Sequence, residues 1–298
     1  MIAGLFADGN SSRCTYEALR SGDERSARSI TVVTRRVCDH RGQQRRRPLE
    51  PISRNNARMH KLLLTLVCML ASLTANAGSA PERMLIFSKT AGFRHESIPT
   101  AVATLRKLAQ EQGMAADHSE DAGVFAADNL ARYRVVAFAS TTGEILAPAQ
   151  QQAFEGFIRK GGGFLGVHSA ADTGYQWPWY GQLVGAWFKG HPPGLQSTRV
   201  QPEREGQAVG KGWPITDEIY NYRNNPRGQV QVVATVDERL YAGGTMGADH
   251  PVAWCHGFDG GRAWYTGLGH DAAVYANADF LVQLRQGLRY AAGHVPGC

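Results

Sequence analysis

Three histidines stand where buried apolar runs of the sequence end. His95 comes after RMLIF and a polar loop, His168 directly follows GFLGV, and His270 follows AWYTGLG. Such runs predict buried strands of a parallel sheet, whose carboxyl ends share one edge. Imidazole titrates near neutral pH and binds metals, so the three side chains are candidates for one acid/base or metal site. Each histidine taken singly is equally compatible with a surface or core position.

The stretch GGGFLGVHSAADT, residues 161–173, has the form of a strand, a sharp turn and a helix. A nucleophile elbow reads G-x-S-x-G, or the same with cysteine, because its strained turn needs small neighbours. Gly166 and Ala170 supply those neighbours, but His168 occupies the tip. Ser169 lies one residue further and would serve a peptidase or amidase only with a different turn. The elbow therefore predicts acid/base work or metal ligation by a histidine.

Two acidic residues are candidate partners of these histidines. Asp172 follows His168 by four residues and can return to hold its imidazole if a helix begins at once. Glu96 adjoins His95 and is a second candidate orienting or acidic group. The predicted catalytic set is therefore His168, His270, His95, Asp172 and Glu96.

A metal site needs three or four ligands. His95, His168 and His270, joined by His191 or His256, are candidates to supply them. No H-x-x-x-H or similar local spacing occurs, so two alternatives stay open. One is metal-free acid/base chemistry, and the other is a divalent cation such as Zn, Mn or Fe.

An aromatic segment follows the elbow. YQWPWYGQLVGAWFKGHP, residues 175–192, contains Trp177, Trp179 and Tyr180 around Pro178. Flat aromatic faces bind the C–H faces of sugar rings, so this region is a predicted carbohydrate platform, with His191 and His256 as further substrate-binding candidates. Packing in the core is the competing interpretation.

The charge of the chain is concentrated at its start. The net charge is +6, and residues 1–58 account for all of it, with twelve Arg, no Lys and six acidic residues. The remainder is neutral, so the composition gives no support for a nucleic-acid-binding surface. Residues 1–58 show no helical or strand period and are predicted to be a non-native or disordered extension.

Residues 59–77 have the build of a signal peptide. Met59, a short basic start, an apolar run over 62–73 and Ala75-Asn76-Ala77 follow in order. Twelve apolar residues are too few for a span that needs about 20, so no stable membrane anchor is expected. The prediction is a periplasmic or secreted protein starting at Met59, the competing interpretation being a buried apolar helix.

Two cysteines remain after this leader, Cys255 and Cys298. A disulfide between them is compatible with an oxidising compartment, but nothing in the sequence fixes their separation.

Strand and helix patterns alternate from Arg83 onwards. Helices are predicted from Ser97 as N-cap, from Pro148, and over 279–292, between the strands 83–87, 135–140 and 163–167. STRVQPE and QVQVVATVD read as alternating strands, and residues 250–270 read as a hairpin turned at 259–261. This predicts a mostly parallel sheet with an antiparallel extension, flanked by helices.

Four ordered motifs carry a family resemblance: GGGFLGVHSAADT, WPWYGQLVGAWFKGHP, HPVAWCH and GRAWYTGLGHD. Together they resemble the ThuA-like (trehalose utilisation) family over a domain of residues 83–292. The resemblance implies the class I glutamine amidotransferase-like fold, a flavodoxin-like three-layer α/β sandwich. It also implies a link to disaccharide metabolism, including 3-keto sugar intermediates. Because His168 stands where amidotransferases of that fold carry a cysteine, glutamine amidotransferase activity is not expected.

These observations lead to two hypotheses. The first is an exported hydrolase or lyase acting on a disaccharide or glycoside through the histidine cluster. The second is a non-catalytic periplasmic sugar-binding or interaction protein with a decayed site. Both take a small-molecule carbohydrate as partner, and neither fixes the oligomeric state.

Overall fold

The computed structural model describes residues 80–204, 207–208 and 210–298. The chain divides into the units Met1–Asn76 and Ala77–Cys298, and the described residues belong to the second. The predicted extension over 1–58 and the predicted signal peptide over 59–77 lie outside the described residues. In the described ranges, no helix combines the length and apolar character that crossing a membrane requires.

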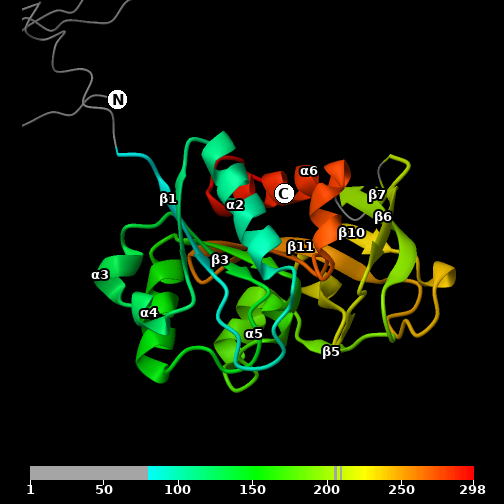
Figure 1. Ribbon diagram of the computed structural model, residues 1–298, viewed down its shortest axis with the longest axis horizontal. Helices are drawn as coiled ribbons and strands as arrows, with labels where there is room; N and C mark the ends of the chain where they lie inside the picture. The colour runs from blue at the N-terminus through cyan, green and yellow to red at the C-terminus, as the bar shows by residue number, and fades with distance from the viewer. Residues whose placement is uncertain (1–79, 205–206, 209) are drawn as a thin grey trace, which may run out of the picture. The chain divides into compact units, whose positions relative to one another are not determined.

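A ten-stranded sheet runs through the centre of the described unit (Figure 1). Its order is β2-β1-β3-β4-β12-β11-β10-β6-β7, and β8 pairs with β6. The first five strands in this order are parallel, and the pairings from β12 onward are antiparallel. The strands are β1 (Arg83–Phe87), β2 (Ala115–Ser119), β3 (Val135–Ala139), β4 (Gly163–Val167), β6 (Gln196–Arg204), β7 (Gln207–Ala208), β8 (Trp213–Asp217), β10 (Gln231–Val236), β11 (Pro251–Phe258) and β12 (Gly261–Thr266).

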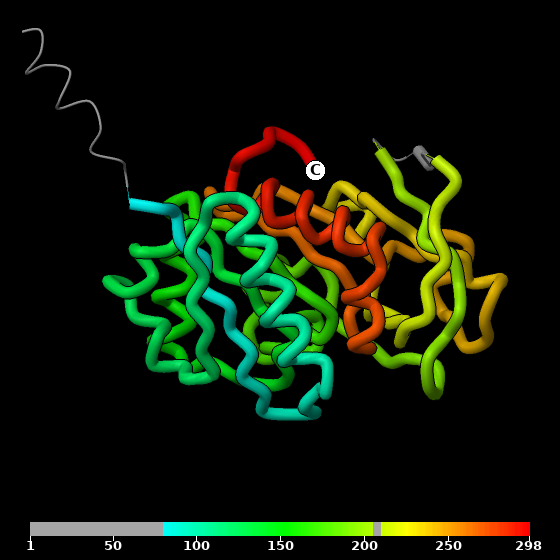
Figure 2. Tube along the Cα trace, turned by 45° about the horizontal axis from the view of Figure 1, so that its top comes forward, coloured from blue at the N-terminus to red at the C-terminus, as the bar shows by residue number. Residues whose placement is uncertain are grey.

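Helices cover both faces of the sheet. On one face α2 (Ile98–Glu111) and α6 (Ala278–Ala291) lie beside each other, as Figure 2 shows, and pack on the inner residues of β1, β3 and β4. On the other face α3 (Ala127–Leu130), α4 (Pro148–Arg159) and α5 (Pro178–Val184) bury a second core rich in phenylalanine. The predicted three-layer, flavodoxin-like α/β sandwich is confirmed.

The antiparallel extension begins with the predicted hairpin. β11 and β12 pair with Phe258 opposite Gly261, so Asp259 and Gly260 form a two-residue turn. Both have positive φ, 46° and 89°, as the hairpin turn that matches strand twist requires. A small separate sheet joins β5 (Phe188–Gly190) to β9 (Asn221–Tyr222).

The prediction missed β2. Its sequence AADHS has few apolar residues because it is an edge strand whose residues are all only half-buried.

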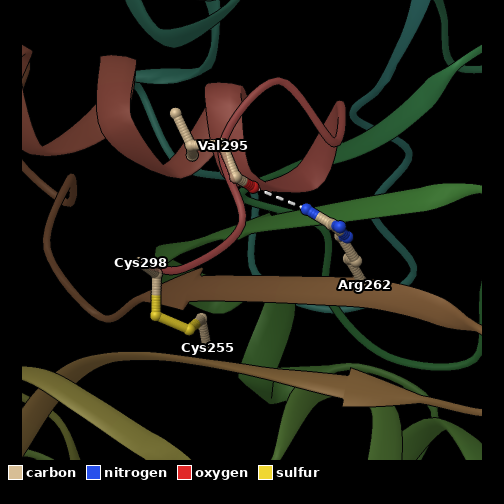
Figure 3. The surroundings of a disulfide bond; sticks show 4 residues. All are labelled: Cys255, Arg262, Val295 and Cys298. Atoms are coloured by element: carbon tan, nitrogen blue, oxygen red, sulfur yellow. Dashed lines mark hydrogen bonds between the residues drawn. A yellow bond between two sulfur atoms is a disulfide. The ribbon is translucent and has the colours of Figure 1, made fainter. Parts of the chain in front are cut away.

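A disulfide joins Cys255 on β11 to Cys298 at the end of the chain (Figure 3). Next to it the Arg262 guanidinium donates a hydrogen bond of 2.6 Å to the carbonyl of Val295. The two contacts fasten the tail that follows α6 to the sheet. Because the cysteines are separated by 43 positions in the sequence, the closed loop stabilises the fold by about 4 kcal/mol in the chain-entropy description.

Candidate functional site

Four side chains from four separate segments converge at the carboxyl edge of the parallel strands. His95 comes from the loop between β1 and α2, His168 from the end of β4, and His270 from the loop after β12. The fourth is Glu218, which directly follows β8. One donor atom from each lies within 4.8 Å of all the others. The three predicted histidines are therefore brought together, and a carboxylate joins them.

His168 sits on a strained turn, as the elbow motif predicts. Its φ is +50°, in the left-handed region that non-glycine residues rarely adopt, and its side chain is fully buried. Gly166 in β4 lets the Tyr265 ring pack close to the strand just before the turn, because a Cβ there would meet that ring at 2.9 Å. The Tyr265 hydroxyl also donates a hydrogen bond of 2.8 Å to the carbonyl of His168. Several packed groups thus hold the turn in a conformation it would not adopt freely.

The carbonyl of Gly267 determines which way the His168 ring faces. His168 Nδ1 lies 2.9 Å from that oxygen, which can only accept, so Nδ1 carries the proton. The lone pair of Nε2 consequently points into the cluster. The prediction that Asp172 holds this imidazole is wrong, because residues 168–172 form a 3-10 helix and Asp172 instead accepts a 2.6 Å hydrogen bond from Tyr175.

The donor atoms of the four side chains lie close together. His168 Nε2 lies 3.1 Å from His95 Nε2, 3.3 Å from His270 Nδ1 and 3.6 Å from Glu218 Oε1. His270 Nδ1 lies 3.3 Å from the same carboxylate oxygen. A tetrahedral zinc ion with bonds of about 2.1 Å places its ligand atoms about 3.4 Å apart. The three histidines and Glu218 therefore have the spacing of a ligand set for one divalent cation.

Burial keeps two of the histidines in the neutral form that metals require. Desolvation lowers the pKa of His168 well below its usual value and lowers that of His95 to about 4, with the charge of His270 adding to the effect on His95. His270 differs, because its hydrogen bond with Glu218 raises its pKa. At neutral pH the two most buried rings thus present lone pairs.

The loop that carries His270 is held by a buried carboxylate. Asp217 accepts hydrogen bonds from the backbone N–H of Gly269 at 2.6 Å and of Asp271 at 3.0 Å, one on each side of His270. Its burial raises its pKa to about 7. The Ser97 hydroxyl donates a hydrogen bond of 2.9 Å to the carbonyl of Gly269 in the same loop. Ser97 is the N-cap residue of α2, as predicted, but its side chain does not cap the helix. Its hydroxyl instead links the loop that carries His95 to the loop that carries His270.

Three further side chains, Ser169, His191 and Tyr220, contact members of the cluster. The Ser169 hydroxyl lies 3.3 Å from His95 Nδ1, which leaves His95 Nε2 for the cluster. Ser169 is fully buried in this contact, so no exposed serine nucleophile is present at the elbow. His191 reaches the cluster through Glu218, with its Nδ1 3.2 Å from Oε2. The ring of Tyr220 covers His168, with centroids 4.3 Å apart.

The predicted sugar platform lies in the second core instead. Trp177 is 6% exposed, and its indole N–H donates 2.9 Å to Glu155. The Trp179 indole N–H donates to Asp259, and the Tyr180 hydroxyl donates to the carbonyl of Ala170. Trp177 stacks on Trp179 and Tyr180, and Tyr180 stacks on Phe138. Both indoles meet the Phe154 ring edge to face. Packing accounts for their positions.

Two further predicted residues stay apart from the cluster. His256 Nε2 lies 3.1 Å from the carbonyl of Gln182, beside α5. Glu96 is exposed, although its neighbour His95 is buried. Neither contributes to the geometry of the ligand set.

Sequence reasoning missed Glu218 and Asp217. Asp217 is the last residue of β8, WPITD, a strand of alternating burial in the antiparallel part of the sheet, and Glu218 directly follows it. No site was expected there. The available signal was the acidic pair at the end of a strand. Its partners could not be found without knowing that β8 lies at the far side of β6.

Comparison with known proteins agrees with this architecture. A model of the ThuA family, described as trehalose utilisation, matches residues 83–291. No curated protein matches the chain.

Among solved structures, a ThuA-like protein from Bacteroides uniformis shares 22% identity with a TM-score of 0.59, covering 73% of this chain and 94% of its own. A ThuA-like protein from Parabacteroides merdae shares 17% identity with a TM-score of 0.58, covering 72% of this chain and 91% of its own. At these identities the likenesses establish a common fold. Because the family model spans well over half of the sequence, the chain belongs to the ThuA family.

Proposed function

We propose that this chain is an exported, metal-dependent carbohydrate enzyme, a hydrolase or lyase acting on a disaccharide or glycoside. The observation that carries the proposal is the convergence of three histidine nitrogens and one carboxylate oxygen on one point. The lone pair of His168 Nε2 can accept one hydrogen bond, yet three polar atoms approach it within 3.6 Å. A shared cation explains all three approaches, whereas a hydrogen-bonded chain explains one.

The alternative in which His168 acts directly as a base has less support. The ring is fully buried, Nδ1 is engaged by Gly267, and Nε2 faces His95, His270 and Glu218. The His168 side chain has no exposed surface at which a substrate could meet either nitrogen. The strained, buried elbow is therefore better suited to holding a ligand atom in place than to transferring a proton.

Proton transfer is better assigned to His191. Its Nδ1 lies near two acceptors, the carbonyl of Pro192 at 2.8 Å and Glu218 at 3.2 Å, so it carries the proton there. The lone pair of Nε2 is then available on a ring that is more exposed than any of the ligands. A cation in the cluster would supply Lewis acidity by taking a substrate oxygen as an additional ligand beside the four side chains. Together these groups suit cleavage of a C–O bond.

The substrate class follows from the family, whose description is trehalose utilisation. Hydrolysis would add water across the glycosidic bond. Elimination from a 3-keto glycoside would remove the proton on C2, expel the oxygen at C1 and leave an unsaturated ketone. Both need a base and stabilisation of negative charge on oxygen.

Export is supported by the disulfide between Cys255 and Cys298, since such bonds persist in oxidising compartments. The predicted signal peptide over 59–77 points to the same compartment.

The test supplies trehalose, cellobiose and their 3-keto derivatives to the purified chain, loaded with Zn or Mn or treated with a chelator. Hydrolysis is read as new reducing ends and elimination as ultraviolet absorbance of the enone. Turnover that requires the metal and disappears in His191→Ala, but not in the remote control His294→Ala, supports the proposal. Full turnover after complete metal removal would contradict it, and sugar binding without any turnover would favour the non-catalytic alternative.

A further inference from the structure

The loop that leads to His95 carries an aromatic side chain that the fold does not bury. Phe93 is 65% exposed, the highest value among the large exposed apolar residues of the described ranges. A phenylalanine so exposed contributes little to folding and leaves a large apolar surface in water. Its position two residues before a member of the ligand set suggests a use.

The Phe93 ring lies against the metal-site cluster. Its centroid is 4.9 Å from that of the His95 ring, with an interplanar angle of 82°. The His95 ring is in turn 5.1 Å from that of His270, which is partly exposed. Phe93 therefore lies at the surface beside the cluster, separated from the partly exposed His270 by the ring of His95.

The backbone under Phe93 is held rigidly on one side by Thr142. The Thr142 hydroxyl donates a hydrogen bond of 2.9 Å to the carbonyl of Phe93 and accepts one of 3.2 Å from the N–H of Gly92. The carbonyl of Thr142 accepts 2.7 Å from the N–H of Ala91. These contacts hold the backbone from which the exposed Phe93 ring projects.

The residue after Phe93 anchors the loop on its other side. Arg94 forms two hydrogen bonds with Glu120, of 3.0 and 2.8 Å. The Glu120 carboxylate also accepts from the buried hydroxyl of Ser88. The exposed ring is thus presented by a segment that is fastened both before and after it.

We infer that Phe93 is the aromatic surface on which a pyranose ring of the substrate rests. This inference rests on the carbohydrate class of the proposed function. A sugar stacks its C–H face on an aromatic ring and leaves its hydroxyl groups to polar partners. Of the rings that the sequence suggested for this task, Trp177 is buried in the second core and Trp179 is half-buried against it. Phe93 is exposed and lies beside the cluster, so a sugar on it would place a neighbouring glycosidic oxygen near His270 and His191.

The experiment measures trehalose and methyl α-glucoside binding to the zinc-loaded chain by calorimetry. Phe93→Ala is expected to weaken binding about ten-fold, whereas Phe93→Tyr, which keeps the aromatic face, stays within about two-fold of the parent. Val282→Ala, at an exposed apolar position on α6, is the matched control and should change nothing. Parent-like affinity in Phe93→Ala, or no binding of either sugar by the parent chain, would overturn the inference.

Zinc content and sedimentation on the same preparations separate the two proposals. One zinc per chain in Phe93→Ala, with weakened sugar binding, supports both. Weakened sugar binding in chains that never take up zinc would refute the metal centre and leave the platform standing. A change of oligomeric state in Phe93→Ala would assign the exposed ring to a contact between copies of the chain and refute its role as a sugar surface.

Discussion

The histidine cluster and the tryptophan-rich segment over 177–180 both bury chemically distinctive side chains, but their polar atoms behave differently. In the segment each polar hydrogen reaches an acceptor outside the group, from Trp177 to Glu155, from Trp179 to Asp259 and from Tyr180 to a backbone carbonyl. In the cluster the donor atoms face one another. Buried groups with separate partners indicate packing, whereas buried lone pairs that converge have the arrangement of a cation-binding site.

Removing the proposed carboxylate ligand, Glu218, is expected to have the largest effect of these changes, and the effect is on zinc affinity. Glu218→Ala should reduce zinc affinity by more than about 100-fold, because loss of a ligand exceeds the 10–100-fold cost of an outer-shell change. Competition with a chromophoric chelator measures it. Glu203→Ala removes a carboxylate that pairs with Arg227 instead and serves as control. Equal zinc affinity in Glu218→Ala and the parent would show that Glu218 is not a ligand.

A substitution in the tryptophan-rich segment should lower the stability of the fold without changing zinc binding. Trp177→Ala removes a buried indole and its hydrogen bond, and is expected to cost about 3–5 kcal/mol in the free energy of unfolding. Zinc stoichiometry of the folded fraction should stay at the parent value. Denaturant unfolding and metal analysis of one preparation give both numbers. A variant that unfolds normally but loses zinc would break the proposed division between the two regions.

An intermediate effect is expected where scaffold and cluster meet. Asp217→Asn keeps the size of the side chain but removes one of the two acceptors that hold the backbone on either side of His270. Zinc affinity should fall about 10–100-fold as the His270 ring loses its fixed position. A purely structural role would lower the free energy of unfolding of the apo chain and leave the zinc affinity of the folded chain unchanged.

A pair outside both regions gives the scale of an ordinary surface interaction. Hydrogen bonds from Arg83, chiefly, hold the pKa of Asp117 below its usual 3.8. The ionised Asp117 therefore stabilises the folded state fully above pH 3.8. This contribution is lost as the pH falls through the lower pKa that Asp117 has in the folded chain. Because both side chains are about a third exposed, Asp117→Asn should cost less than about 1 kcal/mol at pH 7. Unfolding at pH 7 and pH 2.5 measures the difference, which should shrink at the lower pH.

The sequence predicted the layered fold because its signals are local. Buried runs such as RMLIF and GFLGV, the helix periods and the turn at Asp259 and Gly260 each determine structure within a few residues. The half-buried edge strand β2 lacks such a signal and was missed. Three cluster members were found for the same reason, since each histidine follows a recognisable strand, directly or after a short loop.

The rest of the site depends on relations between distant segments. Glu218 follows β8, which pairs with β6, far from β1 in the strand order of the sheet. No local pattern therefore links Glu218 to the histidines that follow the parallel strands. The left-handed turn at His168 makes Gly267, and not Asp172, the partner of its imidazole. Aromatic composition alone did not separate the packed ring of Trp177 from the exposed ring of Phe93.

The central claim is that the cluster holds a cation, and the most direct test is the metal content of the purified chain. Protein prepared without chelating tags or buffers, and its His168→Ala variant, would be analysed by mass spectrometry for bound metals. The account predicts close to one equivalent of a divalent metal per chain in the parent and almost none in the variant, with both folded. No metal in the parent, even after reconstitution with Zn, Mn or Fe, would contradict it.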